Sequence, residues 1–331
     1  MRITGPLTAG IVVVACLFAF EACSGSSDGS KVDGAGADGS GANGSGAASG
    51  SGTDGSGATG NVNLNIGGGA SESMAGETGL PTGDSSEICD GIDNDHDGII
   101  DNVDKNGDGV CDCLLIATLG VKGTSGQGDV FAAWLTARSD TGATDLADQT
   151  LTPELLDKYE VIVAQDVHKN HAYSDAEASA LSDWVNKGGG FMTLIGYSSS
   201  GEAHNVNKLL ASFGMSYTDQ QILQKKGSST IPITMWSPHP IDVGVTQVGV
   251  DNGYPVQGLG TTIATGGGFD VAKVQEVGKG HVFLWGDEWI TYNSEWNDHP
   301  DYQVQLMWLN TIKWLTVAGQ CQVTIPSNPP K

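Results

Sequence analysis

The sequence predicts an α/β domain built on a doubly wound, mainly parallel sheet. Three continuous apolar runs, at residues 114–119, 161–164 and 191–195, have the length and composition of buried parallel strands. Two segments with helical features, residues 129–135 and 174–187, lie between them. An alternation of strands and helices is typical of a parallel sheet with helices on both faces.

The ends of these elements carry their own signals. The first apolar run ends at Gly120, and the second follows a short segment at residues 153–156. Ser174 and Glu177, three residues apart, form a capping box that begins the second helix. The glycines at 188–190 end that helix, because glycine readily adopts the backbone conformation found after a last helical turn.

The second half of the domain is less regular. Residues 271–277 and 281–285 have strand character and flank a Gly-Lys-Gly turn, which predicts a β-hairpin. Residues 304–317 predict a final amphipathic helix, whose apolar positions are Leu306, Met307, Leu309, Ile312 and Leu315.

A long segment without core-forming residues precedes the domain. The chain of 331 residues contains 49 glycines, and most of the excess lies in residues 24–86, where aromatic side chains are absent. Such a segment buries too little apolar surface to offset the entropy lost on ordering, so we expect a disordered linker over residues 23–86. The remainder is long enough for one domain of ordinary size.

The net charge of the chain limits the kinds of molecule that it can bind. The chain has 15 basic and 39 acidic residues, a formal net charge of −24. Nucleic acid and anionic lipid head groups would repel such a chain, which excludes nucleic acid as a partner. Clustered carboxylates favour a hard divalent cation instead.

The N-terminus has the features of an export signal. The apolar run at residues 11–20 is too short to span a bilayer but suits a signal-peptide core. The sequence FEAC that ends in Cys23 resembles a bacterial lipobox, although Glu21 departs from its usual residues. The resemblance implies a signal peptide over residues 1–22 and lipidation of Cys23. Ser24, rather than Asp, at the next position favours sorting to the outer membrane or cell surface.

The number of cysteines supports lipidation. Of the six cysteines, Cys16 lies in the apolar run, which leaves five downstream. An odd number of cysteines in an exported chain requires an explanation. Lipidation of Cys23 leaves four, enough for two disulfides in an oxidising compartment. The alternative is ordinary signal cleavage that leaves Cys23 as a free thiol.

An acidic segment directly before the domain repeats itself after eleven residues, from Asp93 to Asp104. Each copy places side-chain oxygens at loop positions 1, 3, 5 and 9 and a glycine at position 6, where a sharp turn around a cation is needed. The backbone carbonyl at position 7 adds a ligand. Asp104 ends the first loop and begins the second. The spacing predicts Ca²⁺ ligands at Asp93, Asp95, Asp97, Ile99, Asp101, Asp104, Asn106, Asp108, Val110 and Asp112.

The two loops are too close together for flanking helices, which excludes a pair of helix-flanked calcium hands. The segment CDGIDNDHDGIIDNVDKNGDGVCDC resembles thrombospondin type 3 repeats and the acidic CDGxDND modules of bacterial surface proteins. The resemblance implies a structural calcium module over residues 87–112. A Cys often stands at the position of His96 in the bacterial modules, so its absence leaves the disulfide pairing open. The alternative is a solvated acidic loop without an ion.

The domain also resembles a known family. The segments LSDWVNKGGGFMTLIG, SPHPIDVGV and GKGHVFLWGDEWIT, followed by WLNTIKWL, resemble the class I glutamine-amidotransferase-like fold, and more narrowly its divergent, trehalose-utilisation-like branches. The resemblance covers residues 113–318 and implies a flavodoxin-like sheet with a nucleophilic Cys at a strand-to-helix elbow. The corresponding turn, residues 196–201, contains no Cys, so we expect no thiol-based amidotransfer. Ser198 and Ser199 are weak nucleophile candidates, because the pattern G-x-S-x-G fails by one position in either register.

Other polar residues are expected at the carboxyl edge of the sheet, where ligands bind in such folds. Asp166, His168 and His171 follow the second strand and offer either a metal site, a base or an exposed polar turn. Asp287 and Glu288 end the last strand. The surrounding aromatic residues suit either a sugar-binding floor or core packing: Trp285, Trp289, Tyr292 and Trp296.

Strand and helix directions predict the disulfides. In a parallel α/β sheet the final helix ends near the edge where the strands begin. Cys113 opens the first strand and Cys321 follows the final helix, which predicts a Cys113–Cys321 bond and leaves Cys89 to pair with Cys111. Four cysteines permit three pairings. A Cys111–Cys113 bond is the least favoured, because a single residue separates the two.

We therefore expect a lipid-anchored surface protein whose calcium-stabilised α/β domain binds a glycan or another surface protein without catalysis. Residues 319–331 would form a C-terminal tail. The alternative is an extracellular carbohydrate or ester hydrolase, with Ser198 or Ser199 as nucleophile and His168 or His171 as base.

Overall fold

The computed structural model describes residues 86–120, 127–165, 167, 170–196, 202–224 and 230–329. All of them belong to one compact unit that begins at Gly76. The predicted signal peptide, Cys23 and the linker up to residue 85 lie outside the described residues. The same holds for four candidate site residues: Asp166, His168, Ser198 and Ser199. Within the described ranges, no helix is long and apolar enough to cross a membrane.

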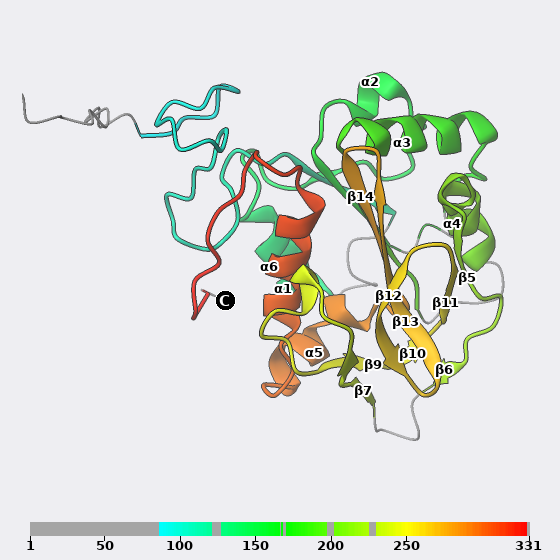
Figure 1. Cartoon of the computed structure of the whole chain (residues 1–331). Helices are drawn as coiled ribbons and strands as arrows, with labels where there is room; N and C mark the ends of the chain where they lie inside the picture. Colours follow the sequence, from blue (N-terminus) through cyan, green and yellow to red (C-terminus); the bar gives the residue numbers. More distant parts are fainter. Residues whose placement is uncertain are drawn as a thin grey trace, which may run out of the picture. The chain divides into compact units, whose positions relative to one another are not determined.

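An eight-stranded sheet forms the centre of this unit (Figure 1). Five neighbouring strands are parallel, in the order β2 (Thr144–Asp145), β1 (Ile116–Gly120), β3 (Val161–Gln165), β4 (Gly190–Leu194) and β14 (Gly280–Trp285). Three antiparallel strands extend the sheet beyond β14: β13 (Phe269–Val277), β12 (Thr261–Gly266) and β8 (Met235–Trp236). The predicted α/β fold with a mainly parallel sheet is confirmed.

Helices form at the three predicted segments, residues 129–135, 174–187 and 304–317, and also at segments for which no helix was predicted. The six α-helices of the described residues are α1 (Asp129–Thr136), α2 (Pro153–Leu156), α3 (Asp175–Lys187), α4 (Glu202–Leu210), α5 (Asn293–Asp298) and α6 (Val304–Leu315). The capping box that begins α3 is present: the Ser174 hydroxyl accepts from the Glu177 backbone N–H, and the Glu177 carboxylate accepts from the Ser174 N–H. Helix α6 ends two residues before the predicted end.

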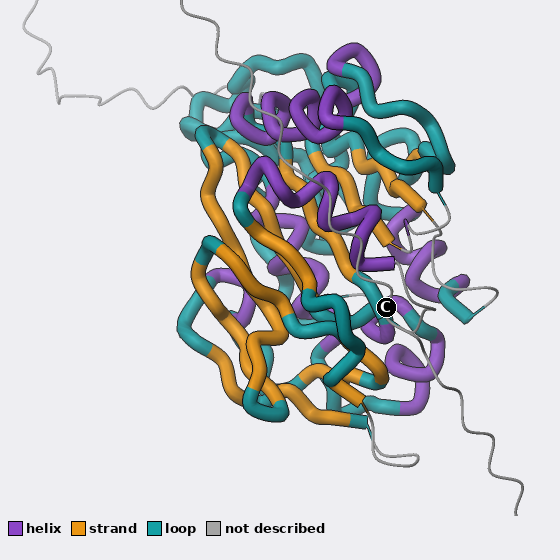
Figure 2. Tube along the Cα trace, turned by 90° about the vertical axis from the view of Figure 1, so that its right-hand side faces the viewer, coloured by secondary structure: helices purple, strands orange, loops and turns teal. Residues whose placement is uncertain are grey.

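Both faces of the sheet are covered by helices (Figures 1 and 2). Side chains along β3 alternate between two apolar clusters: Val161 and Val163 belong to one cluster, and Ile162 and Ala164 belong to the other. The first cluster includes residues of α1 and α6, and the second includes residues of α2, α3 and α4. All four β3 side chains are buried, as a strand covered on both faces requires.

The predicted hairpin of the second half is present as β13 and β14, which pair antiparallel across the turn at Gly278. Between α4 and β12 the chain forms short strands that pair in three separate two-stranded sheets: β5 (Met215–Tyr217) with β11 (Val256–Gly258), β6 (Leu223–Gln224) with β10 (Asn252–Gly253), and β7 (Ile231–Ile233) with β9 (Val248–Val250). None of these strands was predicted, because each is too short for a clear alternation of apolar residues.

The C-terminal segment packs along the acidic repeat (Figure 1). Ile100 donates its N–H to the Gly319 carbonyl, and its own carbonyl accepts from the Cys321 N–H, both at 2.9 Å. Gly109 also lies against Pro326 and Ile325, because a Cβ at this glycine would meet the Pro326 ring at 2.8 Å. Residues 319–326 are thus part of the folded unit and contact both loops of the acidic repeat.

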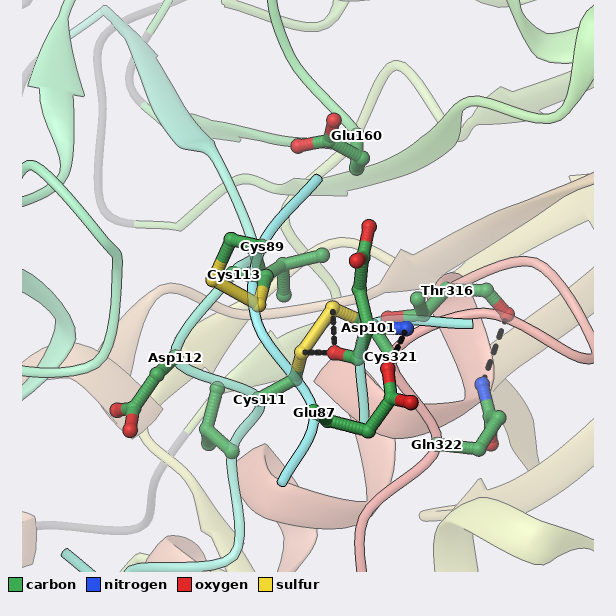
Figure 3. Close-up of a disulfide and its surroundings, with 12 residues drawn as sticks. Glu87, Cys89, Asp101, Cys111, Asp112, Cys113, Glu160, Thr316, Cys321 and Gln322 are labelled. Carbon is green, nitrogen blue, oxygen red and sulfur yellow. Dashed lines mark hydrogen bonds between the residues drawn. A yellow bond between two sulfur atoms is a disulfide. The ribbon is translucent and has the colours of Figure 1, made fainter. Parts of the chain in front are cut away.

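The predicted disulfide pairing is wrong. The bonds join Cys89 to Cys113 and Cys111 to Cys321 (Figure 3), not Cys89 to Cys111 and Cys113 to Cys321. Cys321 does lie near the beginning of β1, as the direction of α6 predicted. It bonds to Cys111, two residues before Cys113, because the C-terminal segment pairs with Ile100 of the acidic repeat. That contact places Cys321 next to Cys111.

Candidate functional site

The acidic repeat folds as two loops with the same hydrogen bonds. In the first loop, the Asp93 carboxylate accepts from the Asp97 N–H at 3.1 Å and from the Gly98 N–H at 3.0 Å. In the second loop, eleven residues later, Asp104 accepts from Asp108 at 3.0 Å and from Gly109 at 3.1 Å. The repeat in the sequence is therefore also a repeat in the structure.

The position-3 side chains repeat as well. Asp95 accepts from the Asp97 N–H at 3.0 Å, and Asn106 accepts from the Asp108 N–H at 2.9 Å. Gly98, at position 6 of its loop, has a φ angle of 94°. Glycine adopts this left-handed backbone without steric cost, which explains why both loops have glycine at position 6.

Glu87 joins the first loop, although it lies outside the repeat. It is 8% exposed, and its two carboxylate oxygens accept from the N–H groups of Asp95 at 2.8 Å and Asp101 at 3.0 Å. One carboxylate oxygen each of Glu87, Asp93 and Asp95 lies within 4.8 Å of the others. This donor set contains only oxygen, which hard divalent cations prefer, so the residues present fit a bound metal ion.

Glu87 was not among the predicted ligands, since it precedes the repeat and has no counterpart in the second loop. Its only signal was an acidic residue two positions before Cys89. The Cys89–Cys113 bond closes the ends of the acidic repeat (Figure 3).

The two aspartates at position 9, Asp101 and Asp112, accept hydrogen bonds from different parts of their loops, so the repeat is not exact here. The Asp101 carboxylate accepts from the N–H groups of Asp90 and Gly91, both at 3.0 Å. Asp112 accepts instead from the Lys105 N–H at 2.8 Å. In each case the carboxylate holds a backbone turn.

The two loops lie in different surroundings. The first is largely exposed, whereas Asp108 of the second is 5% exposed. The guanidinium Nε of Arg138, two residues after the end of α1, lies 3.6 Å from Asp108 Oδ2. Arg138 also stacks over the Trp134 ring at 4.2 Å and donates to the Trp134 carbonyl at 3.1 Å. Burial raises the pKa of the Asp108 carboxyl, and the Arg138 charge acts in the opposite direction.

His171, a candidate base, bridges two carboxylates. Its Nδ1 lies 2.7 Å from Asp148 Oδ1, and its Nε2 lies 2.6 Å from Glu177 Oε1. These hydrogen bonds, with Glu177 first, raise the pKa of the imidazole. Burial alone would raise the pKa of Glu177, but hydrogen bonds from Ser174 and His171 outweigh it and lower that pKa to about 2. A ring with both nitrogens held by carboxylates fits a structural link rather than a general base.

The described part of the carboxyl edge contains buried polar groups. Gln165, which ends β3, donates to the Thr291 hydroxyl at 2.8 Å, and Thr291 donates to the Glu288 carbonyl at 2.8 Å. Asp287 and Glu288 are each 1% exposed. Burial raises the pKa of Asp287 to about 7. Gly196 at the end of β4 leaves room for Glu288, whose Cγ would lie 2.3 Å from a Cβ at this glycine.

Most of the aromatic residues near these carboxylates belong to the core. Trp285 is fully buried and stacks with Trp236 at 6.0 Å, and Trp289 is 6% exposed. These two rings therefore cannot form a sugar-binding floor. Trp296 on α5 is only partly buried and lies elsewhere, next to α1.

Comparison with known proteins finds only distant similarities in fold. No protein family and no curated protein matches the sequence. Solved structures that match in fold include a cytoplasmic protein of Salmonella typhimurium, at 14% identity and a TM-score of 0.46, over 62% of this chain and 100% of that chain. A ThuA-like protein from Parabacteroides merdae matches at 10% identity and a TM-score of 0.40, over 65% of this chain and 95% of that chain.

A β-galactosidase from Bacillus circulans matches at 12% identity and a TM-score of 0.39, over 60% of this chain but 30% of that chain. At these identities and TM-scores the matches carry no argument about activity, substrate or partner.

Proposed function

We propose that this chain is an exported, lipid-anchored surface protein whose acidic loops bind Ca²⁺ and thereby stabilise an α/β binding domain. The observation that carries the calcium proposal is the group of Glu87, Asp93 and Asp95, whose oxygens come within 4.8 Å of one another in a loop of matching hydrogen bonds. Several carboxylate oxygens in a flexible loop suit Ca²⁺ better than Mg²⁺, which demands a near-ideal octahedron.

A structural role for the ion follows from where the loops are attached. The second loop contacts the domain through the Cys111–Cys321 bond, the Arg138–Asp108 ion pair and the C-terminal segment. An ion bound by the loops would keep them in the folded conformation and would thereby stabilise these contacts with the domain. Two disulfides suit an oxidising compartment, in keeping with export.

Thermal unfolding of the mature chain in calcium and in chelator tests this function. A ligand that binds only the native state stabilises it by about 2.7 kcal/mol when its concentration is 100 times the Kd. We expect a midpoint several degrees higher in calcium than in chelator. Identical midpoints over millimolar calcium would contradict the proposal, because extracellular calcium modules bind at about 10⁻⁴–10⁻³ M.

The second candidate is a hydrolase for carbohydrate or ester substrates. Asp287 favours this candidate by its place two residues after β14, at the edge of the sheet where ligands bind in such folds. Burial raises the pKa of its carboxyl group to about 7, which suits proton transfer at neutral pH. Aryl esters and aryl glycosides serve as substrates for the test. Turnover that is lost in Ser198→Ala or Ser199→Ala would support the hydrolase and replace the non-catalytic proposal.

A further inference from the structure

A pocket of about 440 Å³ lies between α1 and α5, and neither the repeat nor the carboxyl edge accounts for it. Its size falls within the range of small-molecule sites. It is lined by Val130, Ala133, Trp134, Ala137, Arg138, Trp296 and Asn297.

The sequence of α1 creates this pocket. Val130, Ala133 and Ala137 are spaced three and four residues apart, so they share one face of the helix. The two alanines are exposed and end at Cβ, which leaves space between the helix and Trp296. Larger residues at these positions would fill it.

Two indole rings form the aromatic part of the wall. The ring centroids of Trp134 and Trp296 lie 5.4 Å apart at an angle of 56°. The Trp296 N–H donates to the Ile290 carbonyl at 2.9 Å, which fixes the orientation of that ring. Aromatic rings present a large, rigid apolar surface at low entropic cost, which suits contact with the C–H groups of a sugar ring.

Trp134 supplies a second observation. The residue is 5% exposed, and its indole Nε1 is buried without a hydrogen-bond partner among the described residues. A buried donor without a partner is uncommon and indicates a missing water or ligand acceptor. Trp134 lines the pocket, so a ligand hydroxyl would satisfy this donor once a small shift of the ring exposes it.

The charges around the pocket favour a neutral ligand. Arg138 is already engaged by Asp108 and by the Trp134 ring and carbonyl. A ligand carboxylate would compete with Asp108 and would approach a chain of net charge −24. Hydroxyl groups can instead accept from Trp134 and contact the exposed Asn297 amide at the rim.

We propose that the pocket between α1 and α5 binds a neutral saccharide ring, stacked against Trp296 and hydrogen-bonded by Trp134. This inference rests on the proposed function of the α/β domain as a binding domain, and it assigns the site and the class of ligand. The ring contacts α1 through Ala133 and Ala137, the positions at which the helix leaves room.

Indole N–H resonances of the mature, calcium-loaded chain test the proposal during titration with methyl β-glucoside, methyl β-galactoside and methyl N-acetyl-β-glucosaminide. We expect at least one probe, at concentrations up to about 10 mM, to shift the Trp134 and Trp296 resonances and not that of Trp314. Methyl β-glucuronide, which adds a carboxylate to the same ring, should bind more weakly than methyl β-glucoside.

Two variants locate the site, and their unfolding midpoints are measured beside the parent's because Trp296 also packs against the core. Trp296→Ala removes a partly exposed ring, and Ala133→Gln fills the pocket from an exposed position; each should weaken binding about tenfold. The matched controls are Trp314→Ala, another partly buried tryptophan, and Thr136→Gln, an exposed position on α1 outside the pocket. Both controls should bind as the parent does.

The proposal is overturned if no probe shifts the Trp134 or Trp296 resonances, or if Ala133→Gln binds as tightly as Thr136→Gln. Thermal unfolding of the same samples with and without calcium separates the two proposals. If calcium raises the unfolding midpoint but no saccharide binds, the saccharide proposal is rejected and the calcium proposal stands.

Discussion

The Nε of Arg138 lies 3.6 Å from Asp108 Oδ2, and both side chains are at least nine-tenths buried. This ion pair joins the second acidic loop to the end of α1. A single contact therefore links the repeat, the pocket wall and the central domain.

Loss of Arg138 should destabilise the fold strongly. Arg138→Gln leaves the buried Asp108 carboxylate without its counter-charge, which costs about 3 kcal/mol for a buried pair. The double variant Arg138→Gln/Asp108→Asn should recover part of this loss, because it removes the unpaired charge. Chemical denaturation of the four proteins measures the coupling, and strictly additive losses would argue against a direct interaction.

Loss of loop carboxylates should abolish stabilisation by calcium. Asp93→Asn affects the first loop alone, whereas Asp104→Ala affects both, since Asp104 ends one loop and begins the other. We expect Asp104→Ala to lose most of the shift in unfolding midpoint between calcium and chelator, and Asp93→Asn to lose part of it. Asp183→Asn, at an exposed position on α3, should keep the parent's shift. Equal shifts in all variants would refute a shared site.

The two disulfides should differ in their contribution to stability. The entropy model of loop closure gives up to about 5 kcal/mol for Cys111–Cys321 and about 3 kcal/mol for Cys89–Cys113, since they span 210 and 24 residues. Cys321→Ser with Cys111→Ser should therefore unfold at lower denaturant than Cys89→Ser with Cys113→Ser. Non-reducing peptide mapping establishes the pairing, and a Cys113–Cys321 peptide would contradict the structure.

The buried Asp287 should make stability fall as pH rises. Its folded-state pKa of about 7 lies above its unfolded value of about 3.9, so the folded state holds its proton more tightly. The resulting stabilisation is complete below pH 4 and is lost as pH rises through 7. Asp287→Asn cannot titrate and should show a smaller loss of stability between pH 5 and pH 8. Glu177, with its pKa of about 2, contributes the opposite trend only at low pH.

Cys23 should carry an acyl group in the mature protein. Its position after a signal-peptide core and before a long linker is the reason for this expectation. Mass spectrometry of the mature N-terminus decides the matter, and Cys23→Ser should release the protein from membranes. An unmodified Cys23 thiol would rule out the lipid anchor.

Local signals in the sequence determined much of the fold. The capping box at Ser174, the apolar runs that became β1, β3 and β4, and the β13–β14 hairpin all depend on residues near one another in the chain. The same is true of the two acidic loops, where the spacing of aspartates and the position-6 glycines set the backbone. Such elements are predictable, because their stabilising contacts span only a few residues.

The tertiary structure alone decided the contacts between distant residues. The partner of Cys321 depends on the contact between the C-terminal segment and Ile100. That contact places Cys321 beside Cys111 rather than beside the predicted partner, Cys113. Arg138 reaches the second loop through packing that no local pattern encodes. Glu87 is close to the first loop in the chain, but it has no counterpart in the repeat that would have predicted its role. The pocket beside Trp296 likewise requires α1 and α5 to meet, although they lie far apart in the chain. These features depend on contacts between segments that come together only when the whole chain has folded.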